Sequence, residues 1–449
     1  MAKIKNIYLK ITFVISLLIA IFILIQLFEY DAKVTKKFKR FVPNKIRWVI
    51  KDIHYWYIET FGVNFKYKEK KIILSSNNKV FNFQKFTNSF IDYQGRRAYL
   101  AIKDDKIFLV LGTGLILSTK IDNFFFKEDV KFKNINTNIK KLIKYKKFYH
   151  NSSYGIKGLL VDEKNIYLSL SNEKKKNCFN ISIIKSSLKP NELNFSTLYE
   201  TEKCIDVSNS YGAFQPIQSG GIMDNFNDKE LILSVGDYRF RDKSQSNSSD
   251  YGKILKVNKI TGISKIISKG HRNSQGLFFD KDEKIILSTD HGPSGGDEIN
   301  IHKNLNIVNN YGWPISSYGK HYPSTSKELK GKGRPPLHKS HTKYGFKEPI
   351  IYFTPSIGIS QIIKVSDNLD QDFNKQYFVA SLGKEKKKDG KVNRSRSLHH
   401  IVLDKNFENV IYKDRIEIGS RIRDLKYYKK KKIIFAYLEK DGSIALINK

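Results

Sequence analysis

The sequence predicts an all-β fold, a six-bladed β-propeller preceded by one N-terminal transmembrane helix. Two observations support this prediction. A turn rich in Asp, Asn and Lys, followed by a short apolar run, recurs along the chain from about residue 100. Near the N-terminus, Ile11 to Phe28 is uncharged throughout and is close to the length that crosses a bilayer as a helix. With 40% hydrophobic and 13% aromatic residues, the chain can form a large packed core.

The apolar N-terminal stretch is longer than that of a typical signal peptide, and no A-x-A cleavage pattern follows it. We therefore predict an uncleaved membrane anchor over residues 1–30. Residues 31–69 are basic and aromatic, which fits a juxtamembrane stalk or a short amphipathic helix, and equally a segment packed on the main domain. Long domains translocate largely regardless of flanking charges, so we expect the body on the periplasmic, extracytoplasmic side.

The formal net charge is +36, from 80 Lys and Arg against 44 Asp and Glu, a balance that suggests nucleic-acid binding. The excess is scattered through turns, however, and no helix-turn-helix, finger or RNA-binding signature accompanies it. Attraction to anionic membranes or glycans explains the charge better. We therefore do not expect a nucleic-acid partner.

Cys178 and Cys204 are the two cysteines of the chain. Each lies beside a predicted strand, so in an exported domain they could pair. The alternative is two separate buried thiols, and the disulfide is only narrowly favoured. Two cysteines and ten scattered histidines lack the spacing of zinc ligands.

The repeat defines the predicted propeller over residues 70–449. The runs begin at Ile107, Ile166, Leu231, Ile285, Tyr377 and Ile433. Their spacing is that of one four-stranded sheet with generous loops, and the longest interval contains the Gly- and Pro-rich stretch Ser316 to Pro349. A β-sandwich would instead show regular strand spacing of about 8–12 residues.

Propellers bind ligands where loops from several blades converge, so polar residues at equivalent points of the repeat are site candidates. These are Gln218 to Gly221, Asp237, Arg272, Asn273, the loop Asp290 to Glu298, and Arg421 to Asp424. Arg421 and Arg423 point the same way on a strand, and with Arg272 they suit a carboxylate-bearing ligand. The alternative is that these arginines pair with turn acids such as Asp424.

Several of these motifs are recognisable. The runs GHRNSQGLFFD, DHGPSGGDEINI and NNYGWPISSYGKHY resemble the glucose/sorbosone dehydrogenase family of quinoprotein sugar dehydrogenases. Further matches are SGGIMDNFNDKELILSVGD, YGKILKVNKITG, YFTPSIGIS and SRIRDL, in order between about Gly155 and Ile447. The resemblance implies a six-bladed propeller that oxidises a sugar or other alcohol with pyrroloquinoline quinone (PQQ) and calcium.

The resemblance also implies roles for individual residues. Arg272 and Asn273 match residues that contact the cofactor, and Arg421 and Arg423 match a pair that binds the quinone carboxylates. Gly292 and Pro293 match positions whose carbonyls hold the active-site calcium. Glu298 and Tyr311 match positions that bind a structural calcium in some members. In this chemistry, calcium polarises a quinone carbonyl and the arginines neutralise the tricarboxylate.

The sequence departs from the family at the catalytic base. Gln218 stands where the family carries a histidine, and glutamine is no general base at ordinary pH. Asp237, which matches the acid that orients that histidine, remains and could act as base from a different place. Ile222 replaces a usual arginine, and a family lysine near Leu382 is missing or replaced by Lys384.

Two classes of function follow. The first is a membrane-anchored PQQ-dependent oxidoreductase that acts on a sugar, polyol or other alcohol and passes electrons to an unknown acceptor. The second is a non-catalytic propeller that retains the fold and binds a carbohydrate or envelope ligand. A basic envelope scaffold that binds glycans is a third hypothesis.

Overall fold

The computed structural model describes residues 12, 16, 43–88, 97–208, 214–321, 337–365, 374–383 and 396–449. The chain divides into two compact units, residues 1–63 and 64–449. In the first unit, helix α3 (Asn44–Phe61) begins after Pro43 and ends at Gly62, whose backbone N–H bonds Ile58 O at 2.9 Å. This helix falls in the segment predicted as a stalk or short amphipathic helix.

The predicted anchor lies outside the described residues, except for Thr12 and Ser16. Within the described part of the chain, no helix combines the length and the apolar character needed to span a bilayer.

The second unit is all-β. Its main strands form six antiparallel sets of four, each ordered from the innermost strand outward. They are β4 (Ala98–Lys103), β5 (Lys106–Leu111), β6 (Ile116–Lys120) and β7 (Val130–Thr137); β8 (Gly155–Val161), β9 (Asn165–Lys175), β10 (Cys178–Ser187) and β12 (Ser196–Glu200); β14 (Gly220–Asn225), β15 (Glu230–Val235), β16 (Lys253–Asn258) and β17 (Ser264–Lys269); β18 (Ser274–Asp280), β19 (Ile285–Asp290), β20 (Asp297–His302) and β22 (Ile351–Phe353); β23 (Ile359–Lys364), β24 (Gln376–Ser381), β25 (Ser397–Leu403) and β26 (Val410–Glu417); and β27 (Ile422–Tyr428), β28 (Ile433–Leu438), β29 (Ser443–Asn448) and β3 (Val80–Thr87).

Short elements connect or extend these sets. They are β1 (Val63–Tyr67), β2 (Lys71–Leu74), β11 (Glu192–Leu193), β13 (Ile205–Asp206), β21 (Asn309–Asn310), helices α4 (Ile139–Leu142) and α5 (Lys147–His150), and 3-10 turns η1 (Ile121–Phe125), η2 (Arg241–Ser244), η4 (Thr342–Tyr344) and η5 (Lys429–Lys431).

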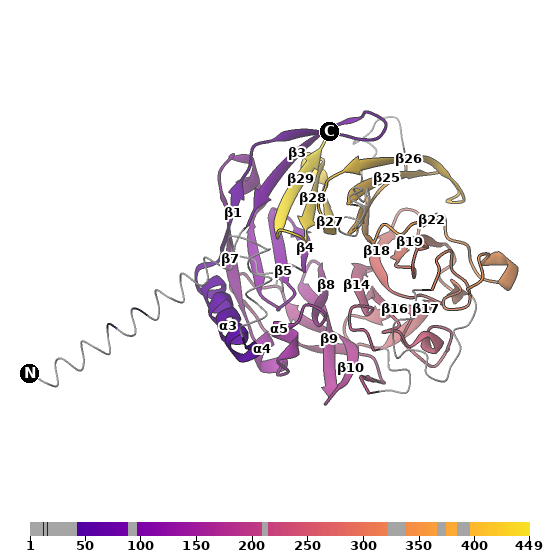
Figure 1. The fold of residues 1–449 in the computed structure, drawn as a ribbon, viewed down its shortest axis with the longest axis horizontal. Helices are drawn as coiled ribbons and strands as arrows, with labels where there is room; N and C mark the ends of the chain where they lie inside the picture. Colours follow the sequence, from indigo (N-terminus) through magenta and orange to yellow (C-terminus); the bar gives the residue numbers. More distant parts are fainter. Residues whose placement is uncertain are drawn as a thin grey trace, which may run out of the picture. The chain divides into compact units, whose positions relative to one another are not determined.

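The innermost strands form a closed ring. In the order β4, β8, β14, β18, β23 and β27 each contacts the next, and β27 contacts β4 again. Figure 1 shows the labelled strands β4, β8, β14, β18 and β27 around a common centre. The arrangement is that of a β-propeller, as the repeat predicted.

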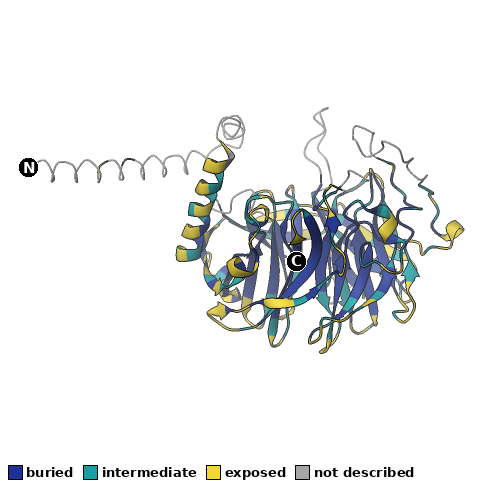
Figure 2. Ribbon diagram, turned by 90° about the horizontal axis from the view of Figure 1, so that it is seen from below, coloured by how far each residue is buried: buried dark blue, intermediate teal, exposed yellow. Residues whose placement is uncertain are grey.

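Each predicted apolar run is the second strand of a set: β5, β9, β15, β19, β24 and β28. Where the structure describes it, the polar turn before a run is the hairpin that joins this run to the innermost strand. These second strands are largely buried, and β19 and β28 are buried along their whole lengths, because neighbouring sheets cover both of their faces. Figure 2 shows the strands largely buried and the exposed residues mainly at the loops.

One closure of the ring was not predicted. Strand β3, near the N-terminus of the unit, pairs antiparallel with β29 at the C-terminus, with Phe86 opposite Ile444. The last set is therefore completed by an early strand, which ties the two ends of the second unit together.

The structure joins Cys178 and Cys204 in a disulfide with Cα atoms 5.4 Å apart. Cys178 is the first residue of β10, and Cys204 directly precedes β13, which pairs with β10. The narrowly favoured pairing is therefore confirmed.

Candidate functional site

We use "mouth" for the end of the ring at which the innermost strands begin and the second strands end. Residues at or just before the start of an innermost strand, or just after a second strand, meet there. Six predicted residues take these positions: Gln218, Asp237, Arg272, Asn273, Arg421 and Arg423. The site that the repeat predicted is therefore brought together from three different sheets.

Gln218 lies between Asp237 and Arg272. The Gln218 carboxamide makes two hydrogen bonds when its nitrogen faces an acceptor and its oxygen faces a donor. In this orientation Nε2 donates to Asp237 Oδ1 at 3.1 Å, and Oε1 accepts from Arg272 Nη2 at 2.9 Å. The backbone that follows needs glycine: Gly221 has φ +104°, and a Cβ there would lie 2.2 Å from Lys157 Cβ. The strand β14 therefore starts in a fixed position two residues after Gln218.

Asp237 is completely buried. Its carboxylate accepts from Trp313 Nε1 at 2.8 Å and from the backbone N–H of Arg239 at 2.8 Å. Burial raises the pKa of Asp237, and Arg272 together with these two donors opposes the rise. The Asp237 carboxyl group therefore has a raised pKa although it is well supplied with hydrogen-bond donors.

Arg272 is held on several sides. Its Nη1 donates to His291 O at 2.8 Å and to Gly292 O at 2.9 Å, and its guanidinium carbon lies 5.4 Å from the centre of the Trp313 ring. Its backbone N–H donates to Asp290 Oδ2 at 3.0 Å. The side chain is therefore fixed before any ligand binds.

Arg421 and Arg423 share one carboxylate, Glu439. Arg421 Nη2 lies 3.1 Å from Glu439 Oε1, and Arg423 Nε donates to Glu439 Oε2. Asp424, the acid considered from the sequence, instead accepts the backbone N–H of Leu100 at 2.7 Å. The alternative that the arginines are paired is thus correct in kind but involves a different acid.

A carboxamide joins the two halves of the mouth. Arg423 Nη1 donates to Gln275 Oε1 at 2.9 Å, and Gln275 Nε2 donates to Asn273 Oδ1 at 3.0 Å. Asn273 Oδ1 also accepts the backbone N–H of Gly220 at 3.2 Å. A single network therefore runs from the first predicted cofactor pair to the second.

Sequence reasoning missed Glu439, although a signal for it exists. It lies six residues after the start of the sixth apolar run at Ile433, as Asp237 lies six residues after the start of the third run at Leu231. Burial raises the pKa of Glu439, but Arg423, Arg421 and Arg97 outweigh burial and lower it to about 2. Glu439 is therefore a carboxylate at any ordinary pH.

Two further cations at the mouth were also missed. Arg97 directly precedes β4, as Arg421 precedes β27, and burial and Arg423 lower its pKa. Lys157 on β8 is buried and donates from Nζ to Ser153 O at 2.6 Å and to Pro216 O at 3.2 Å. Burial, then Arg97 and Arg423, lower the pKa of Lys157.

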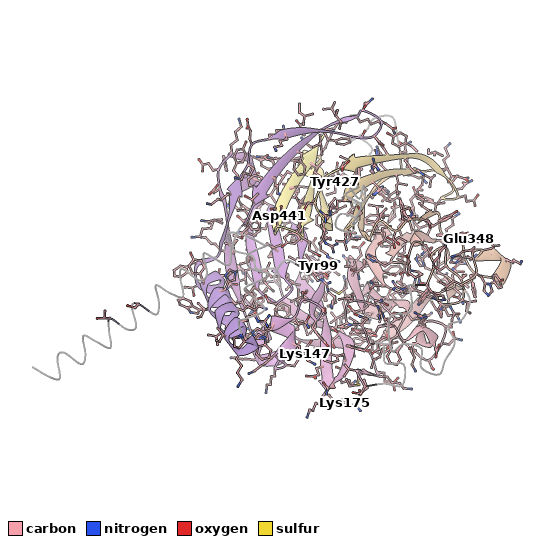
Figure 3. The ribbon with its side chains drawn as sticks, in the orientation of Figure 1. Tyr99, Lys147, Lys175, Glu348, Tyr427 and Asp441 are labelled. Carbon is pink, nitrogen blue, oxygen red and sulfur yellow. A yellow bond between two sulfur atoms is a disulfide. The ribbon has the colours of Figure 1, made fainter. Side chains whose placement is uncertain are left out.

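Tyr99, the second residue of β4, is labelled near the centre of the ring in Figure 3.

The groups assigned to calcium have protein partners. Gly292 O accepts from Arg272, and Pro293 O accepts from Ser356 Oγ at 3.3 Å. At Gly292 a Cβ would lie 2.0 Å from Gly296 O, so the close approach of the two loop segments requires glycine. A calcium ion on these carbonyls would have to compete with the Arg272 guanidinium, which already donates to Gly292 O. The carbonyls as arranged therefore do not fit calcium. Calcium binding at Gly292 and Pro293 stays a prediction from the sequence.

Glu298 and Tyr311, assigned to a second calcium, are buried and line one small cavity together with Arg272, Gly292 and Trp313. Burial raises the pKa of Glu298, and His341 opposes the rise. The Tyr311 hydroxyl donates to Ile301 O at 2.8 Å.

One remaining family difference, Ile222, lies on the innermost strand β14. Ile222 is buried and its backbone N–H donates to Ser234 Oγ at 3.1 Å. Lys384 lies outside the described residues. The carbonyls just before it, of Leu382 and Gly383, accept from Arg421 Nη1 at 3.2 and 2.8 Å.

The chemistry of the mouth fits a polycarboxylate such as PQQ. Five basic side chains gather there, and two of them, Arg421 and Arg423, share the carboxylate of Glu439. The five are Arg97, Lys157, Arg272, Arg421 and Arg423. Guanidinium groups bind planar carboxylates by paired hydrogen bonds, and burial strengthens these bonds. The fold and this mouth define a propeller suited to an anionic small molecule.

The family follows from comparison with known proteins. Residues 138–446 match the model of the family described as glucose/sorbosone dehydrogenase, and the chain belongs to this family. It is 26% identical over 211 residues to the aldose sugar dehydrogenase of Escherichia coli K12, and 26% identical over 222 residues to an uncharacterized protein of Synechocystis. Each match covers 44% of this chain, and 50% and 48% of the relative, so the chain spans about half the length of these curated relatives.

Solved structures agree in fold. A glucose dehydrogenase superposes with a TM-score of 0.58 at 19% identity, covering 78% of this chain and 95% of that chain. The soluble aldose sugar dehydrogenase of Escherichia coli gives 0.57 at 16% identity, over 85% and 98%. The PQQ-bound aldose sugar dehydrogenase of Streptomyces coelicolor gives 0.53 at 18% identity, over 78% and 93%. At these identities the likeness concerns the fold alone.

Proposed function

We propose that this chain is a membrane-anchored, PQQ-dependent sugar or alcohol dehydrogenase-like oxidoreductase. The observation that carries the proposal is the cationic mouth in a member of the glucose/sorbosone dehydrogenase family. Arg421 and Arg423 share the single carboxylate of Glu439, and the charge of Arg97 also helps to lower the pKa of that carboxylate. This leaves net positive charge for the carboxylates of a ligand.

The mouth residues have distinct roles in this proposal. Arg421 and Arg423 bind carboxylates of the quinone, with Glu439 holding both guanidinium groups in place beforehand. Arg272 and Asn273 position the opposite side, each fixed through Asp290. When bound, PQQ accepts the hydride that leaves the carbon bearing the substrate hydroxyl.

The proton of that hydroxyl needs a base, and Gln218 cannot serve. We propose that the Asp237 carboxylate accepts this proton, because burial raises the pKa of Asp237 toward neutral pH. Asp237 lies behind Gln218, so the hydroxyl reaches it only when the Gln218 carboxamide turns aside. Turnover should therefore be slow compared with that of an enzyme whose base faces the substrate.

A second candidate function is a non-catalytic propeller that binds a carbohydrate or envelope ligand. It is favoured by the same observation on Gln218: both ends of its carboxamide have partners, and the arrangement is stable without a base. In this alternative the charged mouth binds an anionic ligand and no oxidation follows.

The membrane anchor and location belong to the proposal. Ile11 to Phe28 supplies the span, and the propeller lies on the periplasmic, extracytoplasmic side. The disulfide between Cys178 and Cys204 supports this placement, because disulfides persist in oxidising compartments.

The test uses the full chain in detergent. Quinone binding is measured by titrating PQQ against intrinsic fluorescence, and turnover by reduction of a dye with a panel of aldoses and polyols. We expect micromolar binding that Arg423→Ala weakens and that Arg415→Ala, on the outermost strand β26, leaves unchanged. Absence of binding at micromolar PQQ would overturn the oxidoreductase; binding with no dye reduction would support the alternative.

A further inference from the structure

His341 lies between the two groups that the family resemblance assigns to a structural calcium. Its ring atom Nδ1 is 3.1 Å from the carbonyl oxygen of Tyr311, and Nε2 is 3.5 Å from Glu298 Oε1. His341 is 1% exposed, so the contact is closed to solvent. The imidazole thus lies between the carboxylate of Glu298, which is on β20, and the backbone carbonyl of Tyr311, which directly follows β21.

The ring is fixed by its surroundings. Ser316 Oγ lies 3.1 Å from Nδ1, and the Tyr318 ring stacks on the imidazole with centroids 5.4 Å apart at 23°. The backbone N–H of His341 donates to Glu348 Oε1 at 2.8 Å, and Glu348 is labelled at the rim in Figure 3. The position of the imidazole therefore does not depend on a bound ion.

A calcium ion does not fit the same place. Calcium takes about 6–8 oxygen ligands at roughly 2.3–2.6 Å, so it would need the Glu298 carboxylate and the Tyr311 carbonyl around one point. The imidazole separates these two oxygens. Among the residues that the structure describes, no three His, Cys, Asp or Glu side chains gather as metal ligands.

The other nearby carboxylate is already used. Glu348 Oε1 accepts from the backbone N–H and the hydroxyl of Thr342, at 2.8 and 2.9 Å, and Oε2 accepts from the Tyr318 hydroxyl at 2.7 Å. It holds the turn η4 and is not free to complete a calcium shell.

We propose that in this chain His341 takes the place of the structural calcium, linking Glu298 on β20 to the backbone at Tyr311. The link also ties the segment 337–349 to the wall of the site beside Trp313. The chain then needs no calcium for the stability of this region. This inference is independent of the proposed function, since it involves neither the quinone nor turnover.

The test compares calcium with chelator on the full chain in detergent, without quinone. Thermal unfolding in calcium and in EGTA should give the same midpoint, and Glu298→Gln should not change the number of calcium ions bound, measured by titration with terbium luminescence and by metal analysis. A midpoint that falls in EGTA, together with loss of one bound ion in Glu298→Gln, would overturn the proposal. An ion that remains in Glu298→Gln lies elsewhere and supports it.

Variants of the histidine add a second readout. His341→Ala should lower the midpoint by a few degrees, because it leaves the buried Glu298 carboxylate with only its long contact to Asn300, at 3.5 Å, among the contacts described. His338→Ala, in the same segment but stacked on Tyr344, is the matched control and should have a smaller effect. If His341→Ala fails to fold, the calcium comparison on the wild-type chain still decides the question.

Discussion

Gln218 and Asp237 are hydrogen-bonded at 3.1 Å, from Nε2 to Oδ1, where the family resemblance expects a histidine and its orienting acid. The acid is kept at Asp237, and a carboxamide stands where the resemblance expects the titratable ring. The pair therefore retains the geometry of an oriented base without the base itself.

Gln218→His should create or raise dehydrogenase activity. A histidine at this position would have Asp237 as its orienting acid, and general base catalysis contributes about 10²–10⁴-fold. Dye reduction by the PQQ-loaded chain, with aldoses as substrates, measures the effect. Gln215→His, three residues earlier, is the control; an equal gain there would show that the effect does not depend on Asp237.

Trp313→Phe should destabilise the propeller by about 1–3 kcal/mol, since it removes a donor from a buried carboxylate. Urea unfolding measures the loss. Tyr311→Phe removes a hydroxyl bonded to a neutral backbone carbonyl, so its cost should be smaller, about 1 kcal/mol. The prediction fails if the two variants lose equal stability.

Glu439→Gln should flatten the acid side of the stability profile. The pKa of Glu439 is lowered to about 2 in the folded chain, so its ionic contribution is complete above the unfolded pKa near 4.5 and is lost as pH falls toward 2. That contribution is roughly 3 kcal/mol at neutral pH. Unfolding free energies between pH 5 and about 2 test this. Glu417→Gln, exposed on β26, should leave the profile unchanged.

Replacing both Cys178 and Cys204 by serine should destabilise the propeller by about 3.5 kcal/mol, the loop-closure value for a separation of 26 residues. The midpoint of chemical unfolding is the measurement. A reductant should lower the wild-type midpoint similarly and leave the double variant unaffected. No shift in either experiment would contradict a disulfide that stabilises the fold.

Deleting residues 1–30 should release the protein from membranes, because it removes the predicted span. Fractionation of cells expressing the deleted chain tests this. Deleting residues 1–10 alone keeps the span and should leave the protein in the membrane fraction. Persistent membrane association of the longer deletion would contradict a single-span anchor.

The sequence by itself determined the repeat, the second strand of every sheet and the mouth positions of Gln218, Arg272 and Arg423. These features are local, since a polar turn and an apolar run specify a hairpin wherever they occur. Only the tertiary structure decided that Glu439 holds Arg421 and Arg423, that β3 closes the last sheet, and that His341 stands between Glu298 and Tyr311. Each of these contacts depends on which side chains and strands lie side by side in three dimensions, and a repeat of polar turns and apolar runs does not specify that.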